Sequence, residues 1–173
     1  MKSFILVTVQ HTGTNAFRNH AESIGYRDQK LISARKIGER RIEPEGVAYW
    51  AHSFHFPNGN PKKSLFYVTM IRDPRDVAAS WLRRYGTTND NRDWRATGSL
   101  WGQYKRWFEM DFDVTVKVED PKEGFDKLSE LTGVDFGATL KPANIGPKGK
   151  VNMDDPRLDD LLTNPVFESY QCR

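Results

Sequence analysis

An arginine at the end of an apolar run is well placed in this sequence to bind an anion. The run, residues 65–71, is rich in strand-forming types and predicts a strand buried on both faces. Arg72 follows it, and Asp73 and Pro74 then have the types that cap and begin a helix. Ligands of open parallel sheets bind at such strand ends, where an arginine beside a helix N-terminus suits an anion. Taken alone, the stretch favours a simpler interpretation, a surface arginine paired with Asp73 or Asp76.

A second candidate anion site follows the first apolar run, residues 4–9. Thr12, Gly13 and Thr14 lie between this expected strand and an amphipathic helix that we expect to end near Ser23. Backbone amides at a helix N-terminus can hold an anion, a glycine lets the backbone approach it, and threonine hydroxyls add donors. The Walker A pattern and its lysine are absent. An ordinary turn between strand and helix explains this loop equally well.

Two of the four histidines, His52 and His55, follow a third expected strand over residues 47–51. Histidine can act as a general base near neutral pH, although a structural role is favoured for either residue taken alone. A metal pair lacks a nearby carboxylate or cysteine to complete its ligands. Further along the chain, Lys148 and Lys150 flank Gly149 in a loop that suits either an anion-binding lid or a solvated basic surface.

The remaining patterns complete an alternation of strands and helices. They predict a short strand near residues 30–33, an aromatic helix over 99–110, a strand over 114–118, a helix from Asp120 and Pro121 to Gly133, and a short final helix over 155–162. This alternation predicts an α/β fold with three layers, in which helices cover both faces of a central parallel sheet. We expect a single domain over residues 1–173. The loop that contains Thr12, Gly13 and Thr14, here called the threonine loop, and Arg72 should lie at the same edge of the sheet.

Composition limits the classes of function. The 173 residues are 38% hydrophobic and 28% charged, with a net charge of +3, which suits a globular protein with an anionic ligand. A dedicated nucleic-acid-binding protein usually carries a denser basic stripe, so nucleic acid is not the expected partner. The single cysteine, Cys172, excludes an intrachain disulfide and a cysteine-based zinc site. With no membrane span or signal peptide in the sequence, we expect a cytoplasmic protein.

In their order along the chain, these segments resemble the sulfotransferases that use 3′-phosphoadenosine 5′-phosphosulfate (PAPS). Residues 11–15, His-Thr-Gly-Thr-Asn, are similar to the 5′-phosphosulfate loop of that family, which is typically Lys-Ser-Gly-Thr-Thr. Residues 53–57, Ser-Phe-His-Phe-Pro, resemble the Lys-Thr-His-Leu-Pro segment that carries the catalytic base. Residues 72–80 resemble the 3′-phosphate motif, with Arg72 and Ser80 at the spacing of the family, and this match is the most specific. The resemblance covers roughly residues 4–149.

The resemblance implies a P-loop-like fold and a complete set of roles. The residues implied to bind the donor are Thr12, Gly13, Thr14 and Asn15 at the 5′-phosphosulfate, with Arg72, Ser80, Lys148 and Gly149 at the 3′-phosphate. His55 would accept the proton of an acceptor hydroxyl or amine on a small molecule, glycan or peptide. PAPS would be the donor, adenosine 3′,5′-bisphosphate (PAP) the product, and no metal would be required.

The sequence also departs from the family pattern. His11 replaces the lysine that steadies the leaving oxygen, so the role would fall to protonated His11, to Arg18 or to a backbone amide. Ala16 replaces the aromatic residue that commonly stacks on adenine, so another ring would be needed. Two alternatives remain open, a P-loop nucleotide kinase or related phosphotransferase and a non-catalytic nucleotide- or RNA-binding module. The missing Walker lysine argues against the first of these.

Overall fold

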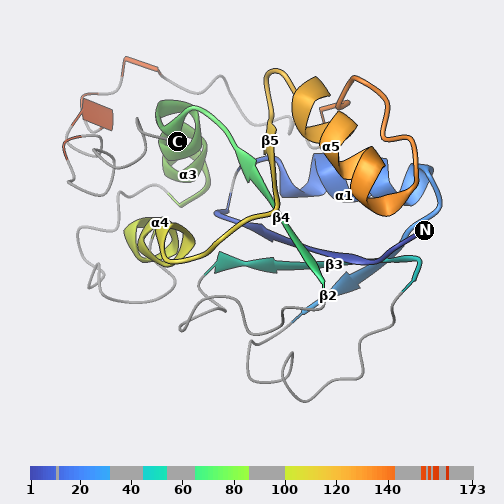
Figure 1. The fold of residues 1–173 in the computed structure, drawn as a ribbon. Coiled ribbons are helices and arrows are strands. Elements are labelled where there is room, and N and C mark those ends of the chain that lie inside the picture. The colour runs from blue at the N-terminus through green and yellow to red at the C-terminus, as the bar shows by residue number, and fades with distance from the viewer. Residues whose placement is uncertain are drawn as a thin grey trace.

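The computed structural model of the chain describes residues 1–10, 12–31, 45–53, 65–85 and 100–142, with a few positions between 153 and 163. Within this part, five strands form one all-parallel sheet in the order β2-β3-β1-β4-β5 (Figure 1). The strands are β1 (Phe4–Thr8), β2 (Arg27–Lys30), β3 (Val47–His52), β4 (Phe66–Ile71) and β5 (Val114–Lys117). The parallel sheet predicted from the alternating pattern is therefore confirmed.

Helices cover both faces of this sheet. They are α1 (Thr14–Ser23), α3 (Pro74–Tyr85), α4 (Leu100–Phe108) and α5 (Lys122–Thr132). Helices α1 and α5 share one hydrophobic core with Phe4 and Leu6 of β1, whereas α3 and α4 form a second cluster on the other side (Figure 1). The fold is thus the three-layer α/β arrangement that the sequence predicts.

The central strand β1 is buried on both faces, which explains why its sequence is an unbroken apolar run. Phe4 and Leu6 belong to the core shared with α1 and α5, and the alternate residues Ile5 and Val7 belong to a third cluster, with Tyr49 of β3, on the opposite face. A buried threonine of β4 also anchors α4. The Thr69 hydroxyl donates to the Val7 carbonyl at 2.7 Å and accepts from the Trp107 indole N–H at 2.6 Å.

The predicted start of the helix after Arg72 is confirmed. Helix α3 begins at Pro74, and the Asp73 carboxylate accepts the backbone N–H of Arg75 at 2.7 Å, as an N-cap does. At α5 the sequence pattern Asp120-Pro121 predicts the same capping by an aspartate, and this prediction is wrong, because the N-cap of α5 is Pro121, without a side-chain cap hydrogen bond. The C-cap of α5 is Gly133, as predicted, with a φ of 76°.

The second strand begins earlier than predicted, at Arg27, and ends at Lys30. Its sequence, Arg-Asp-Gln-Lys, has no apolar alternation, so the pattern could not locate it; β2 lies at the edge of the sheet, where charged residues are common. The predicted final helix over residues 155–162 lies largely outside the described residues. Among the residues that are described, no helix is long and apolar enough to cross a membrane.

Candidate anion-binding site

The two predicted anion-binding elements lie at the same edge of the sheet. Because all the paired strands are parallel, their carboxyl ends share one edge, and β1 pairs directly with β4. The threonine loop follows β1 at Thr8 and leads into α1, while Arg72 follows β4 at Ile71 and precedes α3. The predicted juxtaposition of the loop and Arg72 is confirmed as a feature of the backbone.

Gly13 brings the loop close to the neighbouring strands. It is the N-cap of α1 and has a φ of 94°, a left-handed conformation that glycine tolerates best. A Cβ atom there would lie 3.2 Å from the Met70 Cε atom and 3.3 Å from the Val118 Cγ2 atom. The loop therefore passes over the ends of β4 and β5, and glycine fits this position for both backbone and steric reasons.

The start of α1 has the properties of an anion-binding helix N-terminus. Its N-cap has no side-chain cap hydrogen bond and its first turn carries no acidic residue. Helical hydrogen bonding begins with the Phe17 N–H, which donates to the Gly13 carbonyl at 3.1 Å. The backbone amides before Phe17 have no intrahelical acceptor, because no helical carbonyl lies four residues before them. Those amides and the helix dipole favour a negative group at this point.

The two loop threonines use their hydroxyls inside the protein. The Thr12 hydroxyl donates to the Val9 carbonyl at 2.7 Å, and the Thr14 and Thr8 hydroxyl oxygens lie 2.7 Å apart in a buried contact. Both residues are nearly inaccessible to solvent. Their hydroxyls hold the loop in shape, and the Thr12 N–H also donates to the Val9 carbonyl at 3.4 Å, so the backbone amides that follow Gly13 are the donors best placed for an anion.

Arg72 makes the kind of pairing that the simpler interpretation predicts. Its Nη2 atom lies 3.3 Å from an Asp76 carboxylate oxygen, one helical turn away, and its Nε atom lies 3.9 Å from a Glu119 carboxylate oxygen. All three side chains are partly exposed, so an anionic ligand can compete for the guanidinium with these carboxylates. Ser80 lies farther along α3 and is partly buried.

Four of the predicted site residues lie outside the described part of the chain. They are His11, His55, Lys148 and Gly149. Their roles stay predictions that rest on the sequence.

One residue at this edge, Gln103, was not predicted as part of the site. Gln103 of α4 is fully buried, and its side chain accepts the Gln10 N–H at 2.8 Å, while its backbone carbonyl accepts the Ser53 hydroxyl at 2.7 Å. It therefore ties the loop after β1 to the residue after β3. His52 lies nearby, with its Nδ1 atom 3.4 Å from the Thr8 hydroxyl oxygen. A polar residue inside the aromatic stripe of α4 is the sequence signal that could have identified Gln103.

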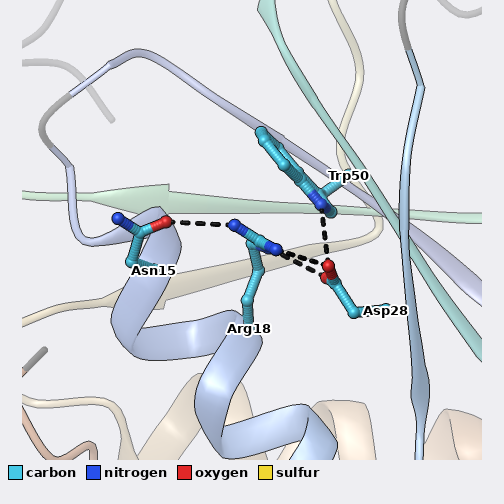
Figure 2. Close-up of polar contacts among 4 residues, drawn as sticks. All are labelled: Asn15, Arg18, Asp28 and Trp50. Carbon is cyan, nitrogen blue, oxygen red and sulfur yellow. Dashed lines mark hydrogen bonds and ion pairs between the residues drawn. The ribbon is translucent and has the colours of Figure 1, made fainter.

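Arg18, a proposed substitute for the missing lysine, is held by other partners instead. Its Nε atom donates to one Asp28 carboxylate oxygen at 2.8 Å and its Nη2 atom donates to the other (Figure 2). The guanidinium carbon also lies 4.1 Å from the centroid of the Trp50 ring system. The hydrogen bond to Asp28 raises the pKa of Arg18 above its ordinary value. Arg18 is thus a fixed cation near the threonine loop, and its guanidinium is already ion-paired with the Asp28 carboxylate.

Comparison with known proteins adds no further assignment. No family model matches the chain, and a search of curated proteins found no match. In the described ranges, no three histidine, cysteine or acidic side chains are grouped so that they could hold a metal ion.

Neutralising Glu119 is expected to strengthen anion binding at Arg72. The Glu119→Gln variant should bind PAP, the nucleotide that the resemblance implies, about two- to fivefold more tightly, because a negative charge is removed near the guanidinium. Isothermal titration calorimetry at low salt measures the change, and high salt should reduce it. The control is Glu130→Gln, which removes the same charge far from Arg72. Glu130 lies near the C-terminus of α5, and this end of the helix is at the opposite edge of the sheet, where the Lys2 N–H donates to the Thr132 carbonyl. Equal effects of the two variants would contradict this prediction.

Proposed function

We propose that this chain is a PAPS-dependent sulfotransferase. The observation that carries the proposal is the pairing of β1 with β4, which puts the threonine loop at the start of α1 beside the end of β4, where Arg72 follows Ile71. A donor with phosphate groups at both ends of its ribose needs two anion sites of this kind. The order of the motifs along the sequence supports the same donor.

In this proposal, one phosphate-bearing end of PAPS binds at the start of α1 and the other binds at Arg72. The 5′-phosphosulfate lies at the N-terminus of α1, on the amides that follow Gly13 and near the Asn15 side chain. The 3′-phosphate lies at Arg72 and Ser80, and the resemblance adds Lys148 and Gly149. Arginine suits this role because its planar guanidinium can donate two parallel hydrogen bonds to a phosphate group.

The reaction that we propose is an in-line transfer of the sulfuryl group. The acceptor oxygen or nitrogen forms a bond to sulfur, and the bond from sulfur to the bridging phosphate oxygen breaks. His55 takes the proton of the acceptor, and the negative charge that develops on the leaving 5′-phosphate is stabilised by the α1 amides and by His11 in its protonated form. PAP is the product that remains.

The proposed acceptor is a hydroxyl or amine group on a small molecule, glycan or peptide. The proposed compartment is the cytoplasm, since a chain with a single cysteine suits a reducing environment.

Transfer of labelled sulfate tests this function. The protein is incubated with PAPS that carries a radiolabelled sulfate, together with panels of alcohols, phenols, sugars, amines and peptides. We expect a labelled product and an equal amount of PAP. Transfer of phosphate from ATP to the same acceptors, with no consumption of PAPS, would contradict the proposal in favour of a phosphotransferase.

A further inference from the structure

Arg18 is held in one orientation by groups on two neighbouring strands. It lies on α1, its carboxylate partner Asp28 lies on β2, and the aromatic ring of Trp50 lies on β3 (Figure 2). Asp28 is fixed in turn, because the Trp50 indole N–H donates to its carboxylate at 3.2 Å. A guanidinium held by two hydrogen bonds and an aromatic face has little freedom to turn.

The remaining edge of this guanidinium sets the orientation of the Asn15 amide. The Arg18 Nη1 atom donates to the Asn15 Oδ1 atom at 3.1 Å, and the Asn15 nitrogen points away from Arg18 (Figure 2). A guanidinium can donate hydrogen bonds but cannot accept them, so the reversed amide would place two sets of donors against each other. Asn15 is exposed in the first turn of α1, where the backbone amides have no intrahelical acceptor. Its NH₂ group is therefore available to a ligand there.

We propose that Arg18 is a positioning residue that makes Asn15 a hydrogen-bond donor to the 5′-phosphate end of the nucleotide. This inference rests on the proposed function and adds a mechanism to it. An asparagine that could flip would present its oxygen to the phosphate in part of the population, and that arrangement is repulsive. The Asp28–Arg18–Asn15 chain prevents the flip, so a carboxylate on the edge strand β2 acts on the anion site through an arginine.

Binding of two nucleotides that differ only in the 5′-phosphate tests this role. The ligands are PAP and adenosine 3′-monophosphate, measured by calorimetry against the native protein and the Asn15→Ala and Arg18→Met variants. We expect Asn15→Ala to weaken PAP binding about ten- to a hundredfold and Arg18→Met to weaken it about three- to tenfold. Both should leave the affinity for the monophosphate unchanged, because that ligand has no group at Asn15. A general loss of structure would weaken both ligands equally.

The double variant shows whether Arg18 acts through Asn15. If it does, Asn15→Ala with Arg18→Met should bind PAP no more weakly than Asn15→Ala alone. Lys30→Met is the matched control for loss of charge. The Lys30 ammonium is a second cation beside Trp50, 5.0 Å from the ring centroid. It should change neither affinity.

Three results would overturn the inference. Additive effects of the two substitutions, or an equal loss of monophosphate binding, would show that Arg18 does not act through the Asn15 amide. A Lys30→Met variant that weakens PAP as much as Arg18→Met would assign the effect to charge alone. In each of these cases native PAP binding persists and the proposed function stands, whereas a native protein that does not bind PAP would overturn both.

Discussion

Replacing His55 with alanine is expected to reduce sulfuryl transfer by about a hundred- to ten-thousandfold, the range typical for loss of a general base. Binding of PAP should persist, because in our proposal His55 contacts the acceptor and not the nucleotide. Steady-state transfer of labelled sulfate, with calorimetry on the same preparation, measures the two effects separately.

His52→Ala is the matched control for this prediction. His52 is three residues earlier, at the end of β3, where its Nδ1 atom lies 3.4 Å from the Thr8 hydroxyl oxygen and its ring packs edge-on against Trp50. We expect it to lower the rate less than tenfold, since His52 has no role in the proposed proton transfer. A His55→Ala variant with full activity would show that the base is assigned wrongly, and a severe loss with His52→Ala would move the assignment to His52.

The Gly124→Ala substitution is expected to destabilise the fold far more than an alanine substitution on the exposed face of α5. The helix lies so close to the sheet at this point that an added Cβ atom would be 2.6 Å from the Thr115 carbonyl oxygen and 2.8 Å from the Val116 Cα atom. Both are backbone atoms, so the helix itself must shift. The cost of overpacking exceeds the gain in helix propensity, and we expect a net loss of about 2 kcal/mol.

Thermal unfolding followed by circular dichroism measures this loss. For a chain of this length, about 2 kcal/mol corresponds to a fall in Tm of about 4–8 °C. Lys127→Ala is the control, because Lys127 is exposed on the same helix and its replacement should change Tm very little. An unchanged or higher Tm for Gly124→Ala would mean that α5 does not approach the sheet this closely.

The sequence predicts the centre of the fold well because the physical signals there are strong. The apolar runs that became β1 and β4 are buried on both faces, and the aromatic stripe of α4 forms a core through Tyr104 and Trp107. The parallel order of the strands then follows from the alternation with helices, and it brings Gly13 and Arg72 to one edge. These elements could be placed without knowing any side-chain contact.

What the sequence could not provide was the set of contacts between distant segments. The edge strand β2 has no apolar pattern, so the pairing of Asp28 with Arg18 and Trp50 had no local signal. The loop threonines looked like free donors, yet Thr12 and Thr14 bond to Val9 and Thr8. Such bonds depend on which strands become neighbours, and that information is not local. For the roles assigned to His11, His55, Lys148 and Gly149, the sequence is the sole basis.

The preference of the protein for a bisphosphate nucleotide tests the central proposal most directly. Calorimetry would compare PAP with AMP and ATP, using the native protein, Arg72→Ala and Arg75→Ala. Arg75 is the control, since it is a second arginine at the start of α3 but bonds to Asp159 at 2.7 Å and to the Met153 carbonyl at 2.9 Å.

We expect the native protein and Arg75→Ala to bind PAP at least about tenfold more tightly than AMP, because charge-assisted hydrogen bonds hold the 3′-phosphate. Arg72→Ala should lose this preference. A native protein that does not distinguish PAP from AMP and ATP, or an Arg72→Ala variant that keeps the preference, would contradict the assignment of this site to PAPS.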